Sequence, residues 1–482
     1  MEKLLILFAI QGLLEAFDTI YHHELTERLP WRRSAADELK LRGISSFLYS
    51  IILLSLGWVH WTGIFTWALA SMLGGKVIIT LMFYFKEGRS RKITKTKRVT
   101  HIILILIYGV ILSIIFPLLL QWAQQPTGYV IMNFGVLSWV MTLYAVFALI
   151  WGWRYLLRGV SWKRAPKNAL KINTLSKTRQ LFLVTGGTGF IGKPLCQALL
   201  DQGHFVTVLT RDMESARSMF TGFIRLVSSL DVLDNSEKFD VVINLAGEPI
   251  SQRWTPNSKL SILESRTETT RVLVAFLKRM IHKPGTLISG SAIGIYGTDR
   301  SITFVEKTPP SKSPVGLFPL EVCSQWEAAA CKAKALGIRT CLLRTGIVLE
   351  IEGGALAKML FPFEFGLGGP VGNGKQWFSW IHRDDLIQLI IHLINDETID
   401  GAVNATSPEP ITNKSFTKAL GKVMKRPTIM ALPAFHIILL FGSMGQAILL
   451  AGQRVLPKKA VESGFKFRYP TIDKALQNIF MR

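Results

Sequence analysis

The sequence predicts two parts of different fold class: an all-α helical bundle, followed by an α/β unit with a doubly wound parallel sheet and a small C-terminal lobe. Three observations support this prediction: a length of 482 residues, several long apolar stretches before residue 155, and a glycine-rich turn between two short apolar runs near residue 190. Because single cores stop growing at about 250 to 300 residues, at least two domains are expected. We place the bundle at 1–155, a basic linker at 156–179 and the α/β unit at 180–482, with its lobe from about 405.

The apolar stretches of the first part are long enough to cross a membrane. They cover residues 4–20, 44–59, 61–85, 101–122 and 129–153, and a hydrocarbon core of about 30 Å needs about 20 helical residues. Hydrophobic residues make up 49% of the chain, which also favours a membrane portion. We therefore expect a transmembrane bundle of about five spans. The first span is the least certain, because Glu15 and Asp18 interrupt it.

The chain has a net charge of +23, and basic residues lie next to these apolar stretches. Two connections and the segment after the last stretch are basic, whereas the connections near His60 and at 123–128 contain no lysine or arginine. The positive-inside rule then predicts an external N-terminus and a cytoplasmic α/β unit, in a multi-pass protein of a bacterial-type inner membrane. Contact with anionic lipid explains the basic excess, so the expected partner is the bilayer and not nucleic acid, while protein partners are left open. The basic residues are Arg28, Arg32, Arg33, Lys40 and Arg42; Lys86, Arg89, Arg91, Lys92, Lys95, Lys97 and Arg98; and Arg154, Arg158, Lys163, Arg164 and Lys167.

A polar cluster lies at the end of the first stretch. Glu15, Asp18 and His22 are spaced i, i+3, i+7 on one helical face, with His23 and Glu24 beside them. Carboxylate and imidazole groups in this pattern can hold a metal, a haem or a quinone inside a bundle. The alternative, which we favour, is that the helix ends at the interface and these groups are hydrated, so no metal ligand is assigned. Lys76, inside the third stretch, is expected to pair with an acid or to mark a break.

A dinucleotide-binding pattern opens the α/β unit. "QLFLVTG" is a short β-rich run, "GGTGFIG" follows as the turn, "FIGKPLCQALLDQG" is helical, and "HFVTVLTRD" is a second strand. In this strand, turn, helix, strand order, Gly186 permits the tight turn, Gly189 lets amides approach a pyrophosphate, and Gly192 lets the helix pack closely. The helix N-terminus then faces the phosphates.

The end of the second strand indicates which dinucleotide is bound. An acid there would bind the ribose 2′-hydroxyl of NAD, but Thr210 and Arg211 come first, and arginine suits a 2′-phosphate. We predict NADP, and Asp212, one residue later, leaves NAD as the alternative.

Further motifs carry a family resemblance. "TGGTGFIG", "NLAGEPI", "LRTGIVL", "QWFSWIHRDDL" and "GQRVLP" all occur between residues 185 and 457. With them, residues 180–482 resemble the extended, atypical branch of the short-chain dehydrogenase/reductase superfamily, and more closely its NADP-binding epimerase family. The resemblance implies a Rossmann-like fold. It also implies cofactor contacts from Thr185, Gly186, Gly187, Thr188, Gly189, Phe190, Ile191, Gly192, Thr210, Arg211, Leu245, Ala246, Gly247 and Arg266, with Val348 near the nicotinamide.

The catalytic pattern of the superfamily is incomplete. Its enzymes use a serine and a YxxxK pair, in which tyrosine transfers a proton and lysine lowers the pKa of that tyrosine. Ser291 stands at the serine position, but Val322 and Trp326 stand where tyrosine and lysine are expected. Tyr296 is the preferred substitute, so the predicted catalytic residues are Ser291 and Tyr296; the other substitutes considered are Glu321, Cys323, Glu327 and His382.

The remaining segments suggest where a substrate is held. Residues 354–380 are rich in glycine and aromatic residues and include Lys375, so they form the expected lid over a small or lipid-like substrate. The apolar segment 435–452 is expected to be a helix of the lobe, in contact with the bilayer, or else a sixth span. The leading function is a membrane-anchored NADP-dependent oxidoreductase or epimerase-like protein. The alternatives are a non-catalytic NADP(H)-sensing or assembly protein coupled to the bundle, and electron transfer from NADPH to a metal or quinone.

Overall fold

The computed structural model describes residues 1–90, 94–164, 175, 179–311 and 313–481. The chain divides into two compact units, Met1–Pro166 and Lys167–Arg482. Most of the predicted linker, and Arg91, Lys92 and Lys167 among the basic residues, lie outside the described residues.

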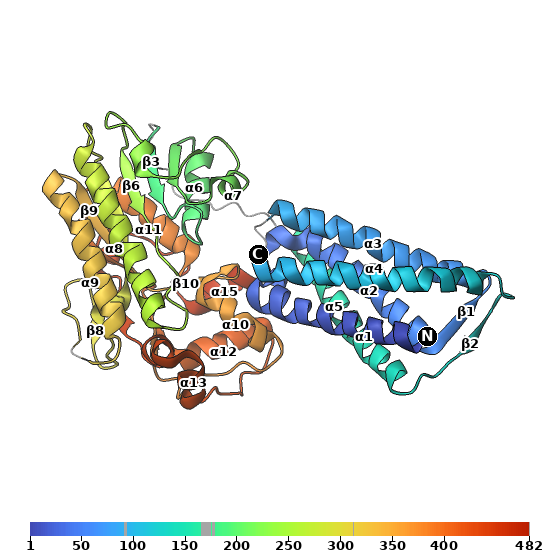
Figure 1. Ribbon diagram of the computed structural model, residues 1–482. Helices are drawn as coiled ribbons and strands as arrows, with labels where there is room; N and C mark the ends of the chain where they lie inside the picture. The colour runs from blue at the N-terminus through green and yellow to red at the C-terminus, as the bar shows by residue number, and fades with distance from the viewer. Residues whose placement is uncertain (91–93, 165–174, 176–178, 312, 482) are drawn as a thin grey trace. The chain divides into compact units, whose positions relative to one another are not determined.

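The first unit is a helical bundle, coloured blue to teal in Figure 1. Its helices are α1 (Glu2–Phe17), which continues as a π-helix over Asp18–Thr26, α2 (Ala36–Trp58), α3 (Phe65–Ser90), α4 (Lys95–Ala123) and α5 (Val136–Arg164). Short 3-10 turns at Leu29–Trp31 and Arg33–Ala35 precede α2. Among the described residues, five helices are long and apolar enough to cross a membrane. The helix α5 ends at Arg164, so it extends beyond the predicted bundle end at residue 155.

The two ends of the bundle differ in chemistry. At one end, β1 (Val59–Thr62) pairs antiparallel with β2 (Gly128–Ile131), which joins the two connections predicted to be external. The N-terminus lies at this same end (Figure 1). Where α4 begins, by contrast, Lys97 is fully buried between Glu27, at 2.6 Å, and Glu87. Glu87 also binds Arg42, at 2.9 Å. One end is therefore held by backbone pairing and the other by ion pairs.

The second unit confirms the predicted α/β class. Its main sheet has seven strands, all parallel, in the order β5-β4-β3-β6-β7-β9-β13. The order reverses between β3 and β6, and ligands of open α/β sheets bind at such a switch point. The strands are β3 (Leu181–Thr185), β4 (Phe205–Leu209), β5 (Arg225–Val227), β6 (Val241–Asn244), β7 (Thr286–Ala292), β9 (Arg339–Thr345) and β13 (Gly401–Ala405).

Helices cover both faces of this sheet. Phe182 and Val184 pack with α6 (Gly192–Asp201) and α11 (Arg383–Asn395), whereas Leu183 packs on the other face with α8 (Pro256–Arg279). The helix α9 (Leu317–Cys331) lies beside α8 (Figure 1). Because successive strand residues point to opposite faces, the continuous apolar run of β3 is buried on both sides.

The apolar run "CLLRTGIVL" is divided between two strands at Gly346. Its second half, β10 (Ile347–Glu350), leaves the main sheet and pairs in parallel with β12 (Trp380–His382). A Cβ at Gly346 would lie 2.7 Å from the Ser379 carbonyl oxygen, so glycine allows this close approach of the two segments.

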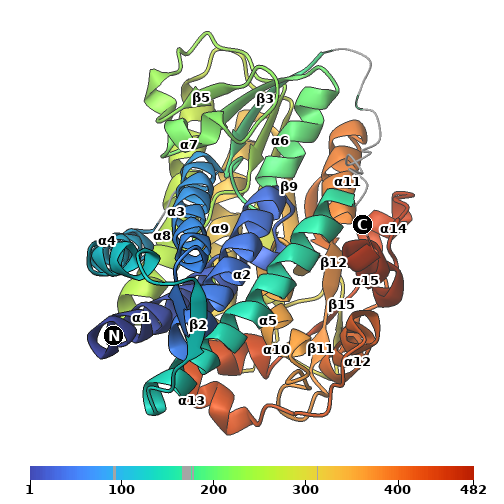
Figure 2. The same cartoon turned by 90° about the vertical axis from the view of Figure 1, so that its right-hand side faces the viewer.

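A C-terminal lobe follows in the structure, and Figure 2 labels β12 of this second parallel pair together with elements of the lobe. Its strand β11 (Trp377–Phe378) pairs with β14 (Ile411–Thr412), so the lobe includes residues before the predicted boundary near 405. Its other elements are α10 (Gly354–Glu364), α12 (Asn413–Met424), α13 (Ala434–Met444), β15 (Arg454–Val455), which pairs with β8 (Thr303–Phe304), α14 (Lys458–Glu462) and α15 (Ile472–Met481).

The apolar helix α13 is too short to be a sixth span. It has 11 residues and contains a non-helical backbone at Gly442, whereas about 20 residues are needed to cross a bilayer. Its outer side chains are nevertheless apolar and exposed, with Phe435 at 64% and Leu439 at 71%. The helix therefore belongs to the lobe, as expected, and presents an apolar face.

Candidate dinucleotide-binding site

The glycine turn after β3 has the geometry that the sequence predicts. Gly186 has φ +69°, and a Cβ there would lie 2.6 Å from the carbonyl carbon of Leu245. A Cβ at Gly192 would lie 2.2 Å from the Gly186 carbonyl oxygen, and one at Gly187 would lie 2.8 Å from the side chain of Val208. These three positions therefore require glycine, because any side chain would collide with backbone or with β4.

The start of α6 is open to an anion. Among the described residues, and apart from its chain neighbours, a Cβ at Gly189 would meet only the Gly186 carbonyl oxygen within 4 Å, at 3.1 Å. The N-cap residue of α6, Ile191, makes no side-chain capping bond. The amides here, next to the half-buried Thr188, are thus not satisfied by a capping side chain, and helix N-termini of this kind bind phosphate.

A buried asparagine joins this turn to the neighbouring strand. Asn244, at the end of β6, accepts a hydrogen bond from Thr185 Oγ1 at 2.7 Å and donates one to Thr270 Oγ1 at 2.8 Å. Thr185 Oγ1 in turn accepts from the amide of Ala246, at 3.3 Å. Leu245 and Ala246 are thereby held against the glycine turn, and their contact with a dinucleotide stays a prediction. The role of Asn244 was not predicted, although its place in "NLAG" was the available signal.

Arg266 reaches the same edge of the sheet from α8. A Cβ at Gly247 would lie 3.0 Å from Arg266 Cζ, so glycine leaves room for the guanidinium. Arg266 Nη1 donates to the Ile262 carbonyl at 2.9 Å, and the group lies 5.3 Å from the ring centre of Trp326. Burial disfavours the charged form of Arg266 and lowers its pKa. An anion bound at this place would stabilise the charged guanidinium. Contact of Arg266 with a cofactor phosphate stays a prediction.

The two charged residues after β4, Arg211 and Asp212, have different surroundings. Asp212 caps α7 (Met213–Arg217): its carboxylate accepts from Ser215 N at 3.1 Å and from Ser215 Oγ at 3.0 Å. Thr210 is buried and Arg211 is exposed. The carboxylate that would favour NAD is therefore engaged in a helix cap.

The next part of the predicted site links the turn to the lobe. A Cβ at Gly353 would lie 2.4 Å from the ring of Phe190, so the glycines before α10 make room for this aromatic side chain. Val348 lies on β10 opposite Ile381. Ile191, Leu245 and Val348 pack against one hydrophobic core cluster, so the structure brings these predicted residues together.

The two predicted catalytic hydroxyls lie in a buried network. Ser291 Oγ donates to Glu327 Oε1 at 2.6 Å, and Arg344 donates to both Glu327 oxygens at 2.8 Å. Tyr296 OH accepts from Arg344 Nη1 at 3.0 Å and donates to Asn404 Oδ1 at 2.7 Å. Tyr296 is only 1% exposed, and burial raises the pKa of its hydroxyl. Both hydroxyls thus bond to other side chains, and their catalytic role stays a prediction.

The structure also shows the surroundings of the other candidate proton donors. Burial raises the pKa of the Cys323 thiol to about 12, so it is protonated at neutral pH. His382 Nδ1 accepts from the Asp384 amide at 3.0 Å and caps α11, while Glu321 is exposed on α9. Val322 and Trp326, in place of the usual tyrosine and lysine, are both buried. Nothing in these surroundings distinguishes one of the substitutes as a proton donor.

The polar cluster predicted near the end of the first apolar stretch does not assemble as one ligand set. Glu15 binds Lys76 at 2.7 Å, Asp18 binds His23 at 3.0 Å, and His22 lies 3.4 Å from Thr100. The i, i+3, i+7 face assumed an α-helix, whereas the chain is π-helical from Asp18 onward. Within the described ranges, no group of three or more His, Cys, Asp or Glu residues could hold a metal ion. The expected pairing of Lys76 with an acid is confirmed.

Comparison with known proteins places the second unit in a family. The model of the NAD dependent epimerase/dehydratase family matches residues 182–405, and a domain of unknown function, DUF1731, matches 432–479. The chain is 38% identical over 304 residues to the epimerase family protein SDR39U1 homolog, chloroplastic, of Arabidopsis thaliana, covering 61% of this chain and 85% of the relative. It is also 38% identical over 297 residues to the epimerase family protein YfhF of Bacillus subtilis, covering 61% and 96%.

Solved structures agree with this assignment. The human epimerase family protein SDR39U1, crystallised with NADPH, superposes with a TM-score of 0.55 at 31% identity and covers 62% of this chain and 98% of its own. A nucleoside-diphosphate sugar epimerase from Corynebacterium glutamicum gives a TM-score of 0.50 at 27% identity, with coverage of 74% and 69%. Through its α/β unit, this chain belongs to the NAD dependent epimerase/dehydratase family.

Proposed function

We propose that this chain is a membrane-anchored, NADP-dependent oxidoreductase or epimerase-like protein that acts on a small or lipid-like substrate. The observation that carries the proposal is the glycine turn at the switch point of the sheet. There Gly186 and Gly192 allow backbone segments to approach so closely that any Cβ would collide with them, and no side chain caps the start of α6. This is the geometry of a pyrophosphate site.

Charge at the ribose end favours NADP over NAD. Arg211 is exposed beside the site, while the carboxylate of Asp212 is engaged by Ser215. A guanidinium forms strong charge-assisted bonds with a phosphate. The solved human relative that contains NADPH supports the same choice.

The residues of this chain would divide the work of binding and chemistry. The nicotinamide, when bound, gives or accepts a hydride. Amides of the glycine turn and Arg266 bind the phosphates, and Val348 shapes the nicotinamide end. Ser291 and Tyr296 are the candidates for proton transfer, and reaching a substrate would require a change in the hydrogen bonds that they make to Glu327 and Asn404.

The bundle would anchor this reaction to a bacterial-type inner membrane. Five helices have the length and apolarity of spans, and the basic connections lie at the end opposite to the β1–β2 pair. The N-terminus is then external and the α/β unit cytoplasmic. A bilayer-facing location also suits a lipid-like substrate.

Titration of the purified full chain with NADPH and NADH tests the cofactor assignment. Because charge-assisted hydrogen bonds contribute about 1.5 to 3 kcal/mol, we expect Arg211→Ala to weaken NADPH binding about tenfold or more and to leave NADH binding unchanged. Arg217→Ala is the matched control, since Arg217 is also exposed but lies on α7. Equal affinities of the wild type for the two dinucleotides would reject the NADP assignment.

A regulatory role is the second candidate. It is favoured by Val322 and Trp326, which cannot provide the proton transfer of the usual tyrosine and lysine. A sensor would respond to the redox state of the dinucleotide without consuming it. Hydrogen exchange of α1–α5, compared with NADPH and with NADP⁺ bound, would then differ. An enzyme would instead oxidise NADPH when membrane lipid extract is added.

A further inference from the structure

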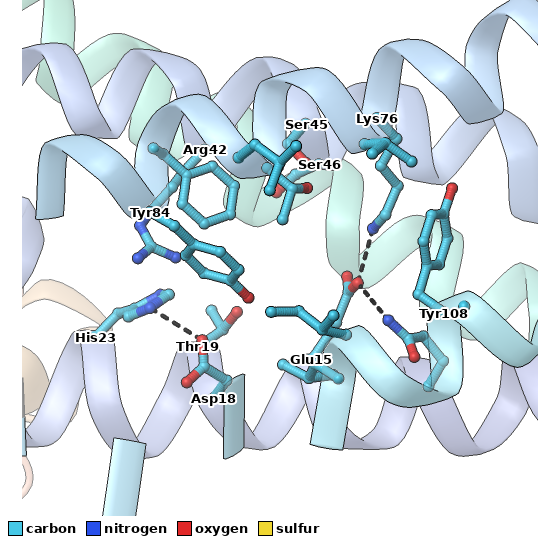
Figure 3. A pocket seen from close by; sticks show the side chains of 18 of the residues that line it. Glu15, Asp18, Thr19, His23, Arg42, Ser45, Ser46, Lys76, Tyr84 and Tyr108 are labelled. Carbon is cyan, nitrogen blue, oxygen red and sulfur yellow. Dashed lines mark hydrogen bonds and ion pairs between the residues drawn. The ribbon is translucent and has the colours of Figure 1, made fainter. Parts of the chain in front are cut away.

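A cavity of about 250 Å³ lies inside the helical bundle. Figure 3 shows its walls, to which all five helices contribute. Two polar ends can be defined. The Glu15 end contains Glu15, Lys76 and Gln11, and the Asp18 end contains Asp18 and His23, with the hydroxyl of Tyr84 directed toward it (Figure 3).

The ionisable groups of this cavity pair with one another or with neighbouring side chains. Lys76 Nζ lies 2.7 Å from Glu15, and His23 lies 3.0 Å from Asp18. Arg42, above the Asp18 end, binds Glu38 and Glu87, each at 2.9 Å. A charged ligand would have to compete with these pairs in a medium of low dielectric constant, which is costly. The walls therefore suit a neutral ligand.

Hydrogen-bonding groups nevertheless face the cavity. Among the described residues, Asp18 Oδ1 has no hydrogen-bond partner, although it lies 3.8 Å from His101 Nε2, and Gln11 Oε1 has no hydrogen-bond partner. Asp18 is 5% exposed and Gln11 is 2% exposed. Lining hydroxyl groups can donate, namely those of Thr19, Ser45, Ser46, Thr80 and Tyr84. Buried polar atoms are rarely left without a partner. The cavity thus offers donors and acceptors to a neutral, polar head group.

The remaining wall is apolar and reaches the outside of the bundle. Leu81 on α3 and Ile105 and Gly109 on α4 line the cavity, and all three are also exposed. If the bundle spans a membrane, as the proposed function states, this opening between α3 and α4 faces acyl chains. A ligand with an apolar tail could then enter from the bilayer.

We propose that this cavity binds the head group of a membrane quinone. A quinone is a flat, neutral ring with a carbonyl on each side and an isoprenoid tail. One carbonyl accepts from Lys76 at the Glu15 end, and the other accepts from Tyr84 at the Asp18 end. In the quinol form, a ring hydroxyl donates to the carboxylate of Asp18, which lines the cavity. The tail leaves past Leu81 and Ile105.

A filled-cavity variant tests the proposal on the full chain in detergent micelles. A Cβ at Gly109 meets no atom within 4 Å, so Gly109→Phe places a ring at the cavity without a backbone clash. Gly74 on α3 is equally open and does not line the cavity, which makes Gly74→Phe the matched control. The assay titrates the protein with decylubiquinone and follows its tryptophan fluorescence, and micelles without protein give the background signal. We expect saturable binding, weakened at least about tenfold by Gly109→Phe and unchanged by Gly74→Phe, since steric exclusion acts only at the cavity.

A milder variant tests the hydrogen bond. Tyr84→Phe removes only a hydroxyl, and we expect it to weaken decylubiquinone binding several-fold. Tyr129→Phe, on β2 and away from the cavity, is its control and should bind as the wild type does. Equal binding by Gly109→Phe and Gly74→Phe, or no saturable binding by the wild type, would overturn the proposal. Displacement of the probe by dioleoylphosphatidylglycerol at equal concentration would also overturn it, in favour of a phospholipid.

The quinone site and the proposed function can be tested separately on the same samples. A chain that binds NADPH and resists extraction from membranes by alkaline carbonate, but binds no decylubiquinone, rejects the quinone site alone. A chain released by carbonate rejects the membrane anchor first.

Discussion

The substitution Glu327→Gln should strongly destabilise the α/β unit. The Glu327 carboxylate accepts from Ser291 at 2.6 Å and from two nitrogens of Arg344 at 2.8 Å. The side chains of Arg344 and Glu327 are only 13% and 11% exposed. The variant therefore leaves a largely buried guanidinium without its counter-charge, since glutamine retains one acceptor oxygen but no charge.

The size of the effect follows from this geometry. Breaking a buried ion pair by removing one partner costs about 3 to 5 kcal/mol. Some exposure and the remaining acceptor reduce the cost, so we expect roughly 2 to 3 kcal/mol. At about 2 °C per kcal/mol, appropriate to a large unit, the melting temperature should fall by about 5 °C.

Thermal unfolding of the full chain, followed by circular dichroism, measures this shift. Glu321→Gln is the matched control, because Glu321 lies on the same helix but is exposed and accepts a hydrogen bond from Gln325 Nε2, at 3.2 Å. It should change the melting temperature by less than about 1 °C. If Glu327→Gln and Glu321→Gln unfold at the same temperature, the network does not stabilise the fold and the reasoning fails.

Three further predictions concern other parts of the chain. Burial raises the pKa of Asp385 from 3.8 to about 6, so the folded state binds this proton more tightly than the unfolded state, and the stability of the wild type falls as pH rises through that window. The melting temperature of Asp385→Asn relative to wild type should therefore increase between about pH 4 and pH 8, and a constant difference would contradict this. A fluorophore attached to the cysteine of Leu439→Cys, on α13, should be quenched by brominated lipid when the full chain is in nanodiscs. A fluorophore attached to the cysteine of Val461→Cys, at an exposed position on α14, should not be quenched. Equal quenching of the two would exclude a bilayer contact specific to α13. Gly192→Ala, whose Cβ would lie 2.2 Å from the Gly186 carbonyl, should abolish NADPH binding, whereas Gly285→Ala, whose nearest atom is at 3.8 Å, should not; retained binding by Gly192→Ala would refute the required close packing.

The glycine turn could be predicted because its signals are local. Gly186, Gly189 and Gly192 lie within one strand, turn and helix, and their spacing alone fixes where backbone segments approach one another. The helix cap by Asp212 was not predicted, although it is also local, because an acid after a strand has two uses, to bind a ribose or to start a helix.

Interactions between distant segments could not be predicted in the same way. The bond from Tyr296 to Asn404 joins residues 108 positions apart, and it exists because β7, β9 and β13 are neighbours in the sheet. Sequence patterns indicate that strands exist but not which polar ends they bring together. The environment of Tyr296 could not be predicted for this reason, since it depends on the order of the strands.

The bundle shows how a predicted number of long apolar helices can match the structure although the account of charge behind it was incomplete. Arg42 and Lys97 were counted as basic signals of the cytoplasmic side, but both are buried in ion pairs with Glu87. Arg154, counted after the last span, likewise pairs with Glu24. Even without these three residues, the first basic connection retains Arg28 and its neighbours, whereas the opposite end has no lysine or arginine in either connection. Because acidic residues contribute little to orientation, the buried pairs do not reverse the bias, and the expected topology is unchanged by them.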